Sequence, residues 1–225
     1  MTTLHAHSTT RLSGLYVITD PEYCGDQLIE KASAAIRGGA QIIQYRNKDA
    51  PSQIQHREAQ ALSSLCSQHG RVFLVNDNVD LAMAVDADGV HLGQSDIVSA
   101  EGDLNSLRKT LEKHATHKKI IGITCHRNIE LAVHAQQQGA DYVAFGRFYT
   151  SQTKPDAPPA RLSVLAEAKH QLNIPIVAIG GITHNNAATL LDAGADMLAV
   201  IHGVFAQDDV EHAAQSFTEL FTHPQ

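Results

Sequence analysis

Cysteine is scarce in this sequence. The 225 residues include only Cys24, Cys66 and Cys125, and no two of them form a C-x-x-C pair. This spacing argues against a disulfide framework and against a zinc–cysteine site, and it fits a protein of the reducing cytoplasm. The 14 histidines are scattered and include no H-E-x-x-H motif, so we expect most of them on the surface.

Positive charge is also in short supply. The formal net charge is −7 at pH 7, so the chain lacks the basic character of a general polyanion binder, and no nucleic acid is expected as a partner. A phosphorylated small molecule is still compatible with this charge, because one lysine and one arginine in a pocket can bind it.

Long hydrophobic runs are missing too. No segment reaches the roughly 20 apolar residues that span a bilayer, so no membrane association is expected. The N-terminal stretch MTTLHAHSTTRLSG lacks the apolar segment of a signal peptide. We expect residues 1–11 to form a flexible tail and residues 12–225 to form one cytoplasmic catalytic domain.

What the sequence does contain is a repeated unit. Eight apolar segments of strand length alternate with stretches of helical spacing, and the segments are apolar on both faces, which predicts a parallel sheet. Eight such units predict a single (β/α)8 TIM barrel, with a doubly wound sheet as the alternative. The expected strands are residues 15–20, 41–46, 72–77, 89–93, 119–125, 142–146, 175–181 and 197–202.

A second repeat marks the junctions between a helix and the next strand. Gly39, Gly139 and Gly194 fall where a helix ends and a positive φ is favoured. The repeated segments are RGGAQ (37–41), VDADG (85–89), QQGAD (137–141) and DAGAD (192–196).

Polar residues collect at the ends of the expected strands, where barrel enzymes build their sites. Their convergence on one rim favours a site over scattered helix caps. They are Gln44, Arg46, Lys48, Asn76, Asp77, His91, Gln94, Asp96, Thr124, Ser151, Thr153 and Lys154.

The basic residues of this rim predict an anion site. Gln44, Arg46 and Lys48 alternate, so on a strand they share one face. A solvated strand end is the plain alternative, whereas an anion clamp would combine the planar fork of arginine with the point charge of lysine.

The carboxylates have two interpretations. Asp77 could cap the following helix, and Asp96 could cap a turn. Together they could instead share one Mg²⁺ ion, and a metal beside basic residues is an arrangement that binds pyrophosphate.

Three further features carry less weight. His91 lies within an apolar strand and is expected to be a hydrogen-bonded core residue. Cys125 and His126 are adjacent and should point to opposite faces, so they are not expected to act as a nucleophile pair. The segment IGGI (179–182), followed by THNN, brings bare backbone amides to a helix start, which is a geometry that binds phosphate.

The segments QYRNK, LVNDNVDLAMAVDADGVHLGQSD, GRFYTSQTK and AIGGIT resemble the thiamine-phosphate synthase family. The similarity runs from about Leu15 to Phe217, with the motifs in the family's order. It implies a (β/α)8 barrel and a Mg²⁺-dependent transferase. Such an enzyme condenses 4-amino-2-methyl-5-(diphosphooxymethyl)pyrimidine with 4-methyl-5-(2-phosphooxyethyl)thiazole to give thiamine phosphate and pyrophosphate. The expected partners are these small molecules, and a homo-oligomer is compatible with the sequence.

The resemblance also implies roles, residue by residue. Asp77 and Asp96 would bind Mg²⁺, and Thr124, where the family commonly has serine, would contact the pyrimidine. The residues implied to bind the pyrimidine pyrophosphate are Gln44, Arg46, Lys48, Asn76 and Lys154. Those implied to bind the thiazole phosphate are Ser151, Thr153, Gly181, Ile201 and His202, the last three through backbone amides.

The implied chemistry needs no nucleophile, because pyrophosphate can leave before the new bond forms and leave a pyrimidine methylene cation. The residues expected to be catalytic are Arg46, Lys48, Thr124 and Lys154. Arg147 and His202 depart from the family pattern, since proline and serine are common at these two positions. Rival hypotheses are a thiazole tautomerase, a non-catalytic barrel that binds a phosphorylated ligand, and another phosphate-binding isomerase or epimerase.

Overall fold

The chain folds as a closed barrel of eight parallel strands. In the computed structural model, residues 12–93, 103–113, 115, 118–150 and 158–222 are described. Each strand pairs with the next along the chain, and β1 pairs with β8, so the sheet closes. The strands are β1 (Gly14–Ile18), β2 (Ile42–Tyr45), β3 (Val72–Asn76), β4 (Gly89–Leu92), β5 (Ile120–His126), β6 (Tyr142–Gly146), β7 (Ile176–Ile179) and β8 (Met197–Val200). The predicted (β/α)8 barrel is confirmed, and the doubly wound alternative is wrong.

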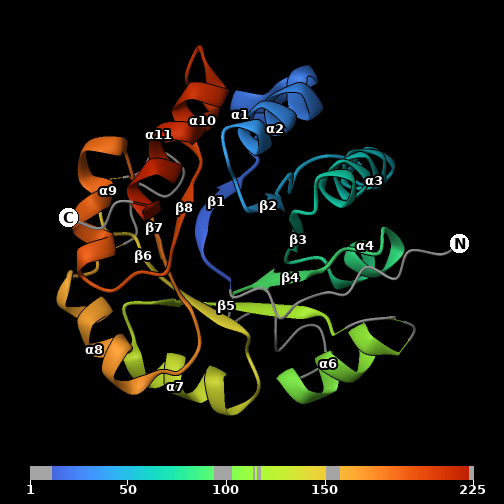
Figure 1. Cartoon of the computed structure of the whole chain (residues 1–225). Helices are drawn as coiled ribbons and strands as arrows, with labels where there is room; N and C mark the ends of the chain where they lie inside the picture. Colours follow the sequence, from blue (N-terminus) through green and yellow to red (C-terminus); the bar gives the residue numbers. More distant parts are fainter. Residues whose placement is uncertain (1–11, 94–102, 114, 116–117, 151–157, 223–225) are drawn as a thin grey trace, which may run out of the picture.

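Helices surround the barrel, as Figure 1 shows in a view nearly along its axis. No helix among the described residues is long and apolar enough to cross a bilayer. The helices are α1 (Pro21–Cys24), a 3-10 turn (Gly25–Gln27), α2 (Leu28–Arg37), α3 (Ser52–His69), α4 (Val79–Ala84), α6 (Leu104–Glu112), α7 (Ile129–Gln137), α8 (Ser163–Gln171), α9 (His184–Asp192), α10 (His202–Phe205) and α11 (Val210–Thr222).

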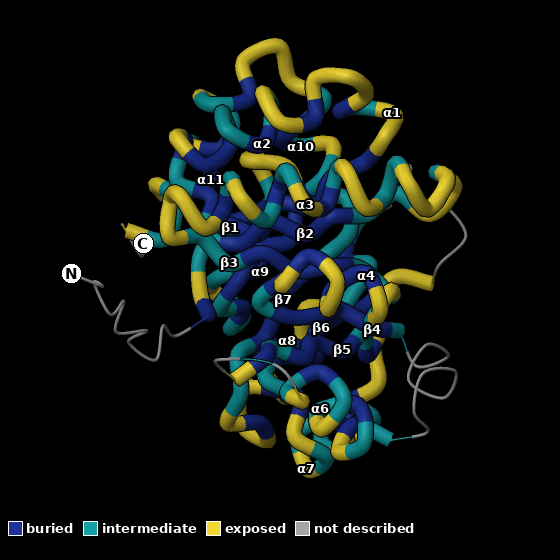
Figure 2. Tube along the Cα trace, turned by 90° about the vertical axis from the view of Figure 1, so that its right-hand side faces the viewer, coloured by how far each residue is buried: buried dark blue, intermediate teal, exposed yellow. Residues whose placement is uncertain are grey.

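The strands are buried on both faces, which is why they read as continuous apolar runs. Alternate residues point outward to the helices, as Ile43 and Phe73 do, and form the larger core. The residues between them, among them Ile42 and Leu74, point into the barrel and form a second, smaller core. Figure 2 shows the result as strands that are almost wholly buried beneath partly exposed helices.

The four repeated junctions share one structure. Gly39, Gly139 and Gly194 have φ values of 98°, 93° and 112°, as predicted, and the second junction places Asp86 at the corresponding point with φ 47°. Each junction precedes an even-numbered strand and has a polar residue, Gln41, Asp88, Asp141 or Asp196, two positions after the residue of positive φ. In three of them an aspartate accepts a hydrogen bond from a backbone N–H of the preceding strand. These bonds are Phe73 N–H to Asp88 at 2.7 Å, Ile121 N–H to Asp141 at 2.9 Å and Ile176 N–H to Asp196 at 2.9 Å.

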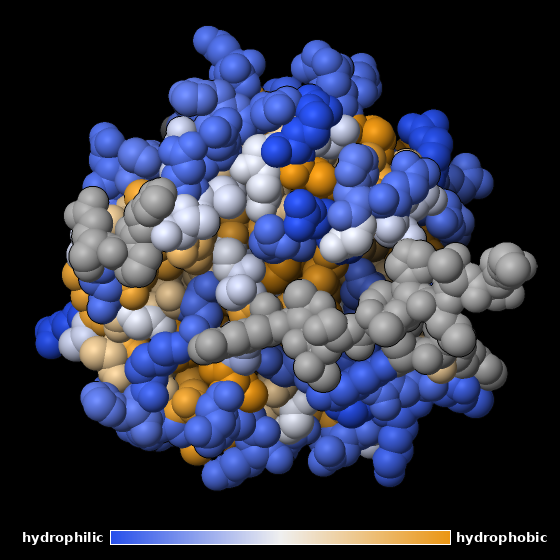
Figure 3. All heavy atoms as spheres, viewed as in Figure 1, coloured by the Kyte–Doolittle hydropathy of each residue, from blue (hydrophilic) through white to orange (hydrophobic). Residues whose placement is uncertain are grey.

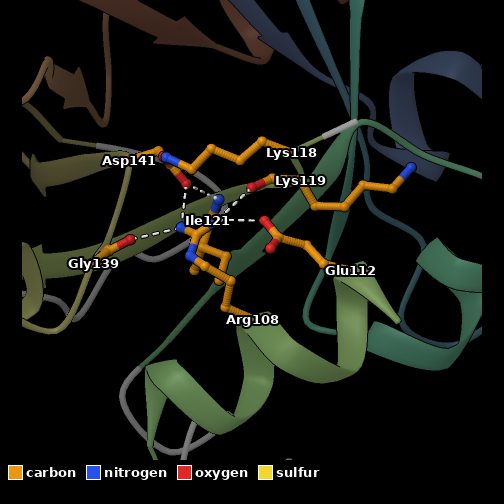
Figure 4. Close-up of polar contacts among 7 residues, drawn as sticks. All are labelled: Arg108, Glu112, Lys118, Lys119, Ile121, Gly139 and Asp141. Carbon is orange, nitrogen blue, oxygen red and sulfur yellow. Dashed lines mark hydrogen bonds and ion pairs between the residues drawn. The ribbon is translucent and has the colours of Figure 1, made fainter. Parts of the chain in front are cut away.

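One of these aspartates also anchors an ion-pair cluster (Figure 4). Arg108 of α6 donates to Asp141 Oδ2 at 2.6 Å and to the Gly139 carbonyl at 2.6 Å, and Lys118 lies 2.5 Å from Asp141 Oδ1. The cluster lies where β5 and β6 begin, at the end of the barrel opposite the C-terminal ends of the strands. Polar groups at that end of a barrel usually serve stability, and we assign this cluster to the fold.

Candidate active site

Several of the polar residues predicted from the sequence lie at the C-terminal ends of the strands. Parallel strands in a closed barrel bring these ends to one face. Gln44, Asn76 and Thr124 lie in the last residues of β2, β3 and β5, while Arg46 and Asp77 follow their strands directly. Five predicted site residues fall outside the described residues: Gln94, Asp96, Ser151, Thr153 and Lys154.

The segment after β2 differs from the prediction. The strand ends at Tyr45, so Arg46 and Lys48 lie beyond it, and the expected common strand face with Gln44 is wrong. Gln44 is 1% exposed and points into the barrel. The backbone N–H of Arg46 donates to Thr19 Oγ1 at 3.0 Å, and the Arg46 guanidinium lies 3.5 Å from the carboxylate of Asp20. Gln44 thus faces the barrel interior, whereas Arg46 contacts the segment that follows β1.

Asp77 is held in an unusual backbone conformation. Its φ is 61°, a left-handed value that few residues other than glycine and asparagine or aspartate adopt. The side chain does not cap the following helix, because Asn78 accepts the hydrogen bond from the Leu81 N–H at 2.9 Å. The interpretation of Asp77 as a helix cap is thus wrong. Such a conformation at a strand end is typical of a positioned side chain.

The Asp77 carboxylate meets two donors. Lys48 Nζ lies 2.5 Å from Asp77 Oδ2, and Asn76 Nδ2 donates to the same oxygen at 2.6 Å. The Lys48 side chain is 54% exposed and that of Asp77 is 24% exposed, so solvent screens the pair. No group of three or more histidine, cysteine, aspartate or glutamate residues able to hold a metal is present among the described residues. Asp96, the second predicted ligand, is not among them.

The end of β7 packs closely against the loop that follows β6. Gly181 has φ 64°, and a Cβ at this position would lie 2.3 Å from the Thr150 carbonyl oxygen, so only glycine fits. The predicted bare amides at the start of α9 are wrong in part. A capping box uses them: the Thr183 N–H donates to Asn186 Oδ1 at 2.9 Å, and the Thr183 side chain accepts from the Asn186 N–H.

The end of β8 leads directly into a short helix. Ile201 occupies the N-cap position of α10. His202 is exposed, and its ring lies edge-on to Tyr23 of α1 with a centroid separation of 5.4 Å. The side chain that replaces the family's common serine therefore packs against α1.

His91 is a hydrogen-bonded core residue, as predicted. It is 8% exposed, and its two ring nitrogens lie 2.8 Å from the Tyr142 hydroxyl and 2.9 Å from Thr124 Oγ1. Cys125 is fully buried, and burial raises the pKa of its thiol to about 12. His126 is exposed at the end of β5. The two neighbours do not form a nucleophile pair, which confirms that prediction.

Sequence reasoning missed three residues. Asp20 ends the first apolar segment just as Asp77 ends the third, so its place at a strand end could have marked it as a candidate for the rim. The Asp20 side chain accepts a hydrogen bond from the Glu22 N–H at 3.0 Å and caps α1. Tyr16 and Tyr142 meet inside the barrel with a hydroxyl separation of 2.9 Å. Their inward direction follows from strand alternation, but their contact depends on barrel closure.

The fold and the polar, partly cationic rim at the C-terminal ends of its strands are typical of a (β/α)8-barrel enzyme. Figure 3 shows one face of the molecule, where hydrophilic residues line the circumference and apolar atoms lie between them toward the middle. Arginine and lysine beside carboxylates at such a site suit an anionic ligand.

Comparison with known proteins agrees with this class. The family model described as thiamine monophosphate synthase matches residues 15–204. Thiamine-phosphate synthase of Alcanivorax borkumensis is 48% identical over 216 residues, which cover 94% of this chain and 95% of that protein. The enzyme of the same name from Thioalkalivibrio sulfidiphilus is 48% identical over 213 residues, covering 94% of this chain and 96% of the relative.

A solved structure supports the same assignment. Thiamine phosphate pyrophosphorylase from Pyrococcus furiosus superposes with a TM-score of 0.80 and 34% identity, covering 93% of this chain and 95% of the other. The chain belongs to the thiamine-phosphate synthase family, whose members are transferases, and the resemblance seen in the sequence is confirmed.

Proposed function

We propose that this thiamine-phosphate synthase family member binds the pyrimidine over Gln44, with its pyrophosphate beside Arg46 and Lys48. The cluster of Lys48, Asn76 and Asp77 carries the proposal. It joins the ends of β2 and β3 through contacts of 2.5 and 2.6 Å. A cation, an amide and a carboxylate in one place can together hold a metal–pyrophosphate group.

The reaction transfers the pyrimidinylmethyl group from pyrophosphate to the ring nitrogen of the thiazole phosphate. The amino-pyrimidine stabilises a methylene cation, so the C–O bond to pyrophosphate breaks before the C–N bond forms. Arg46, Lys48 and Lys154 bind the oxygens of pyrophosphate and stabilise the charge that develops on them. Gln44 and Thr124 orient the pyrimidine, so that the thiazole nitrogen meets the cationic carbon in line.

Asp77 and Asp96 are the residues that would hold Mg²⁺. Asp77 fits this role, because its carboxylate lies at the end of β3 and is still 24% exposed, and it already binds one cation, the ammonium of Lys48, which the metal would replace at Oδ2. Carboxylate oxygens are the ligands that Mg²⁺ prefers. When bound, the metal neutralises part of the charge on the pyrophosphate.

The thiazole phosphate occupies the opposite part of the rim in this proposal. Ser151 and Thr153 contribute hydroxyls from the loop after β6. The backbone amides at Gly181, Ile201 and His202 contribute donors from the ends of β7 and β8. Support comes from the close packing of Gly181 on the loop after β6, which brings these segments together.

The direct test is product formation by the purified protein. It is incubated with the pyrimidine pyrophosphate, the thiazole phosphate and Mg²⁺, and each component is omitted in turn. We expect thiamine phosphate only when all three are present. Isomerisation of a carboxylated thiazole phosphate without the pyrimidine would contradict the proposal in favour of a tautomerase. Binding of thiazole phosphate without turnover would contradict it in favour of a non-catalytic barrel.

A further inference from the structure

Five side chains form one continuous hydrogen-bond chain inside the barrel. Gln44 of β2 donates to the Tyr16 hydroxyl of β1, which lies 2.9 Å from the Tyr142 hydroxyl of β6. Tyr142 lies 2.8 Å from His91 Nδ1, and His91 Nε2 lies 2.9 Å from Thr124 Oγ1. The two ends of the chain, Gln44 and Thr124, are the residues proposed to contact the pyrimidine.

The middle of this chain is built into the core. Tyr16 is 1% exposed and Tyr142 is fully buried. The Tyr142 ring stacks on His91 with a centroid separation of 5.6 Å. It lies so close to β5 that a Cβ at Gly122 would be 1.9 Å from Tyr142 Cζ. Glycine at this position therefore makes room for the ring.

The hydrogen bonds of the chain run in one direction. Each phenol has a single proton to donate, and burial raises the pKa of both Tyr16 and Tyr142, so both hydroxyls stay protonated. Because Tyr16 accepts from Gln44, its own proton must go to Tyr142. Tyr142 then donates to Nδ1 of His91.

This direction also fixes the histidine tautomer. With Nδ1 as an acceptor, the ring of neutral His91 carries its proton on Nε2, and it donates to Thr124 Oγ1. The Thr124 hydroxyl is left with its own proton to donate to a ligand. At the other end, Gln44 uses its amide nitrogen to bind Tyr16, so its Oε1 atom points away from that hydroxyl. Among the described residues, no group donates a hydrogen bond to this oxygen.

We infer that the chain orders the groups offered to the pyrimidine, with an acceptor at Gln44 and a donor at Thr124, and so selects a 4-amino over a 4-oxo ring. This inference rests on the proposed function. A 4-aminopyrimidine presents an amino donor beside a ring nitrogen that accepts. In a 4-oxopyrimidine the pattern is inverted, because the oxygen accepts and the adjacent ring N–H donates. Reversing the chain would require all five groups to change together.

Tyr16 and Tyr142 are positioning residues, because they act on the ligand only through Gln44, His91 and Thr124. Replacing Tyr16 by phenylalanine keeps the ring and removes the hydroxyl that orients the Gln44 amide. The amide can then turn over and offer either its oxygen or its nitrogen. Selection between the two rings should fall, even though no residue that touches the ligand has changed.

The test compares two competitive inhibitors of pyrimidine pyrophosphate use. They are the monophosphates of 5-hydroxymethyl-2-methylpyrimidine with a 4-amino or a 4-oxo group, which lack the pyrophosphate leaving group. The measured quantity is the ratio of the 4-oxo to the 4-amino inhibition constant. We expect the wild type to favour the amino form and Tyr16→Phe to lower this ratio at least about tenfold, as the loss of one specific hydrogen-bond match would.

A matched control comes from the next strand. Tyr45→Phe also removes a buried tyrosine hydroxyl, but this hydroxyl donates outward to Glu58 at 2.7 Å. The ratio of the two inhibition constants in Tyr45→Phe should therefore equal that of the wild type. Tyr142→Phe breaks the same chain at its next link and should lower the ratio as Tyr16→Phe does, which tests the inference even if Tyr16→Phe fails to fold.

Two other outcomes have separate meanings. Equal weakening of both inhibitors by Tyr16→Phe and Tyr142→Phe, with an unchanged ratio, would overturn the inference and assign the tyrosines a purely structural role. A wild-type protein that binds neither inhibitor would instead overturn the proposed function, and with it the inference.

Discussion

Lys48 Nζ lies 2.5 Å from Asp77 Oδ2, and this contact joins the segment after β2 to the segment after β3. The Lys48 side chain is 54% exposed, and an ion pair so open to solvent contributes little to stability. The contact matters instead because it brings a cation and a carboxylate together at the end of the barrel where the pyrophosphate is proposed to bind.

Asp77→Asn should abolish most metal-dependent turnover. Asparagine adopts the same left-handed backbone conformation, so the change removes the charge and leaves the local fold intact. We expect the rate at saturating Mg²⁺ to fall by about 100-fold or more, the usual scale for loss of a group that stabilises developing charge. Steady-state rates measured across a Mg²⁺ titration check this.

The neighbouring residue provides the control for Asp77. Asn78→Ala removes the cap of α4 and should lower the free energy of unfolding by about 1 kcal/mol, with turnover nearly unchanged. A rate close to that of the wild type in Asp77→Asn would remove Asp77 from the site. A comparable loss of turnover in both variants would show that the segment matters only as structure.

Arg46→Ala should separate the two substrates. Arg46 reaches the rim beside Asp20, at 3.5 Å, on the side assigned to the pyrimidine pyrophosphate. We expect kcat/KM for the pyrimidine pyrophosphate to fall by about 100-fold, because a charged donor to the departing group is lost. Thiazole phosphate affinity, measured by calorimetry, should change less than about threefold. Equal losses for both substrates would contradict the assignment of Arg46.

Asp141→Asn should weaken the fold without touching the chemistry. The carboxylate of Asp141 holds Arg108, Lys118 and the Ile121 N–H at the far end of the barrel. Loss of its charge should lower the free energy of unfolding by about 1–3 kcal/mol in urea, with unchanged kcat and KM. The exposed Asp208→Asn serves as the matched control. Altered kinetic constants in Asp141→Asn would show that the two ends of the barrel are coupled.

The cysteines should resist alkylation in the native protein. Burial raises the pKa to about 12 for Cys66 and Cys125 and to about 11 for Cys24. A rise of about three units lowers the thiolate fraction near pH 8 roughly a thousandfold, and the thiolate is the form that reacts. Mass spectrometry after iodoacetamide treatment should find no label until denaturant is added. Fast native labelling of Cys125 would contradict its burial in the larger core.

Much of the fold could be predicted from the sequence. All eight strands were found, because strands buried on both faces leave a continuous apolar signal that does not depend on their neighbours. The glycines at the junctions were predictable for a similar reason, since a positive φ at a helix end has a local cause. Asp86 adopts the same conformation without glycine and gave no such signal.

The site was harder to predict where it depends on exact element ends. Neighbouring polar residues can each cap the same helix, and in the segment after β3 the cap of α4 is Asn78 rather than Asp77. The strand at β2 ends before Arg46, so a pattern of alternate residues did not place Lys48. The contact between Tyr16 and Tyr142 joins β1 to β6 across the barrel, and only closure of the sheet brings such residues together.

The most direct test is a crystal structure of the protein with the pyrimidine pyrophosphate and Mn²⁺, whose anomalous signal marks the metal site. We expect a metal bound to a carboxylate oxygen of Asp77, with the pyrophosphate beside Arg46 and Lys48. The 4-amino group of the ring should donate to Gln44 Oε1. A metal away from Asp77, with the pyrimidine bound elsewhere than over Gln44, would contradict it.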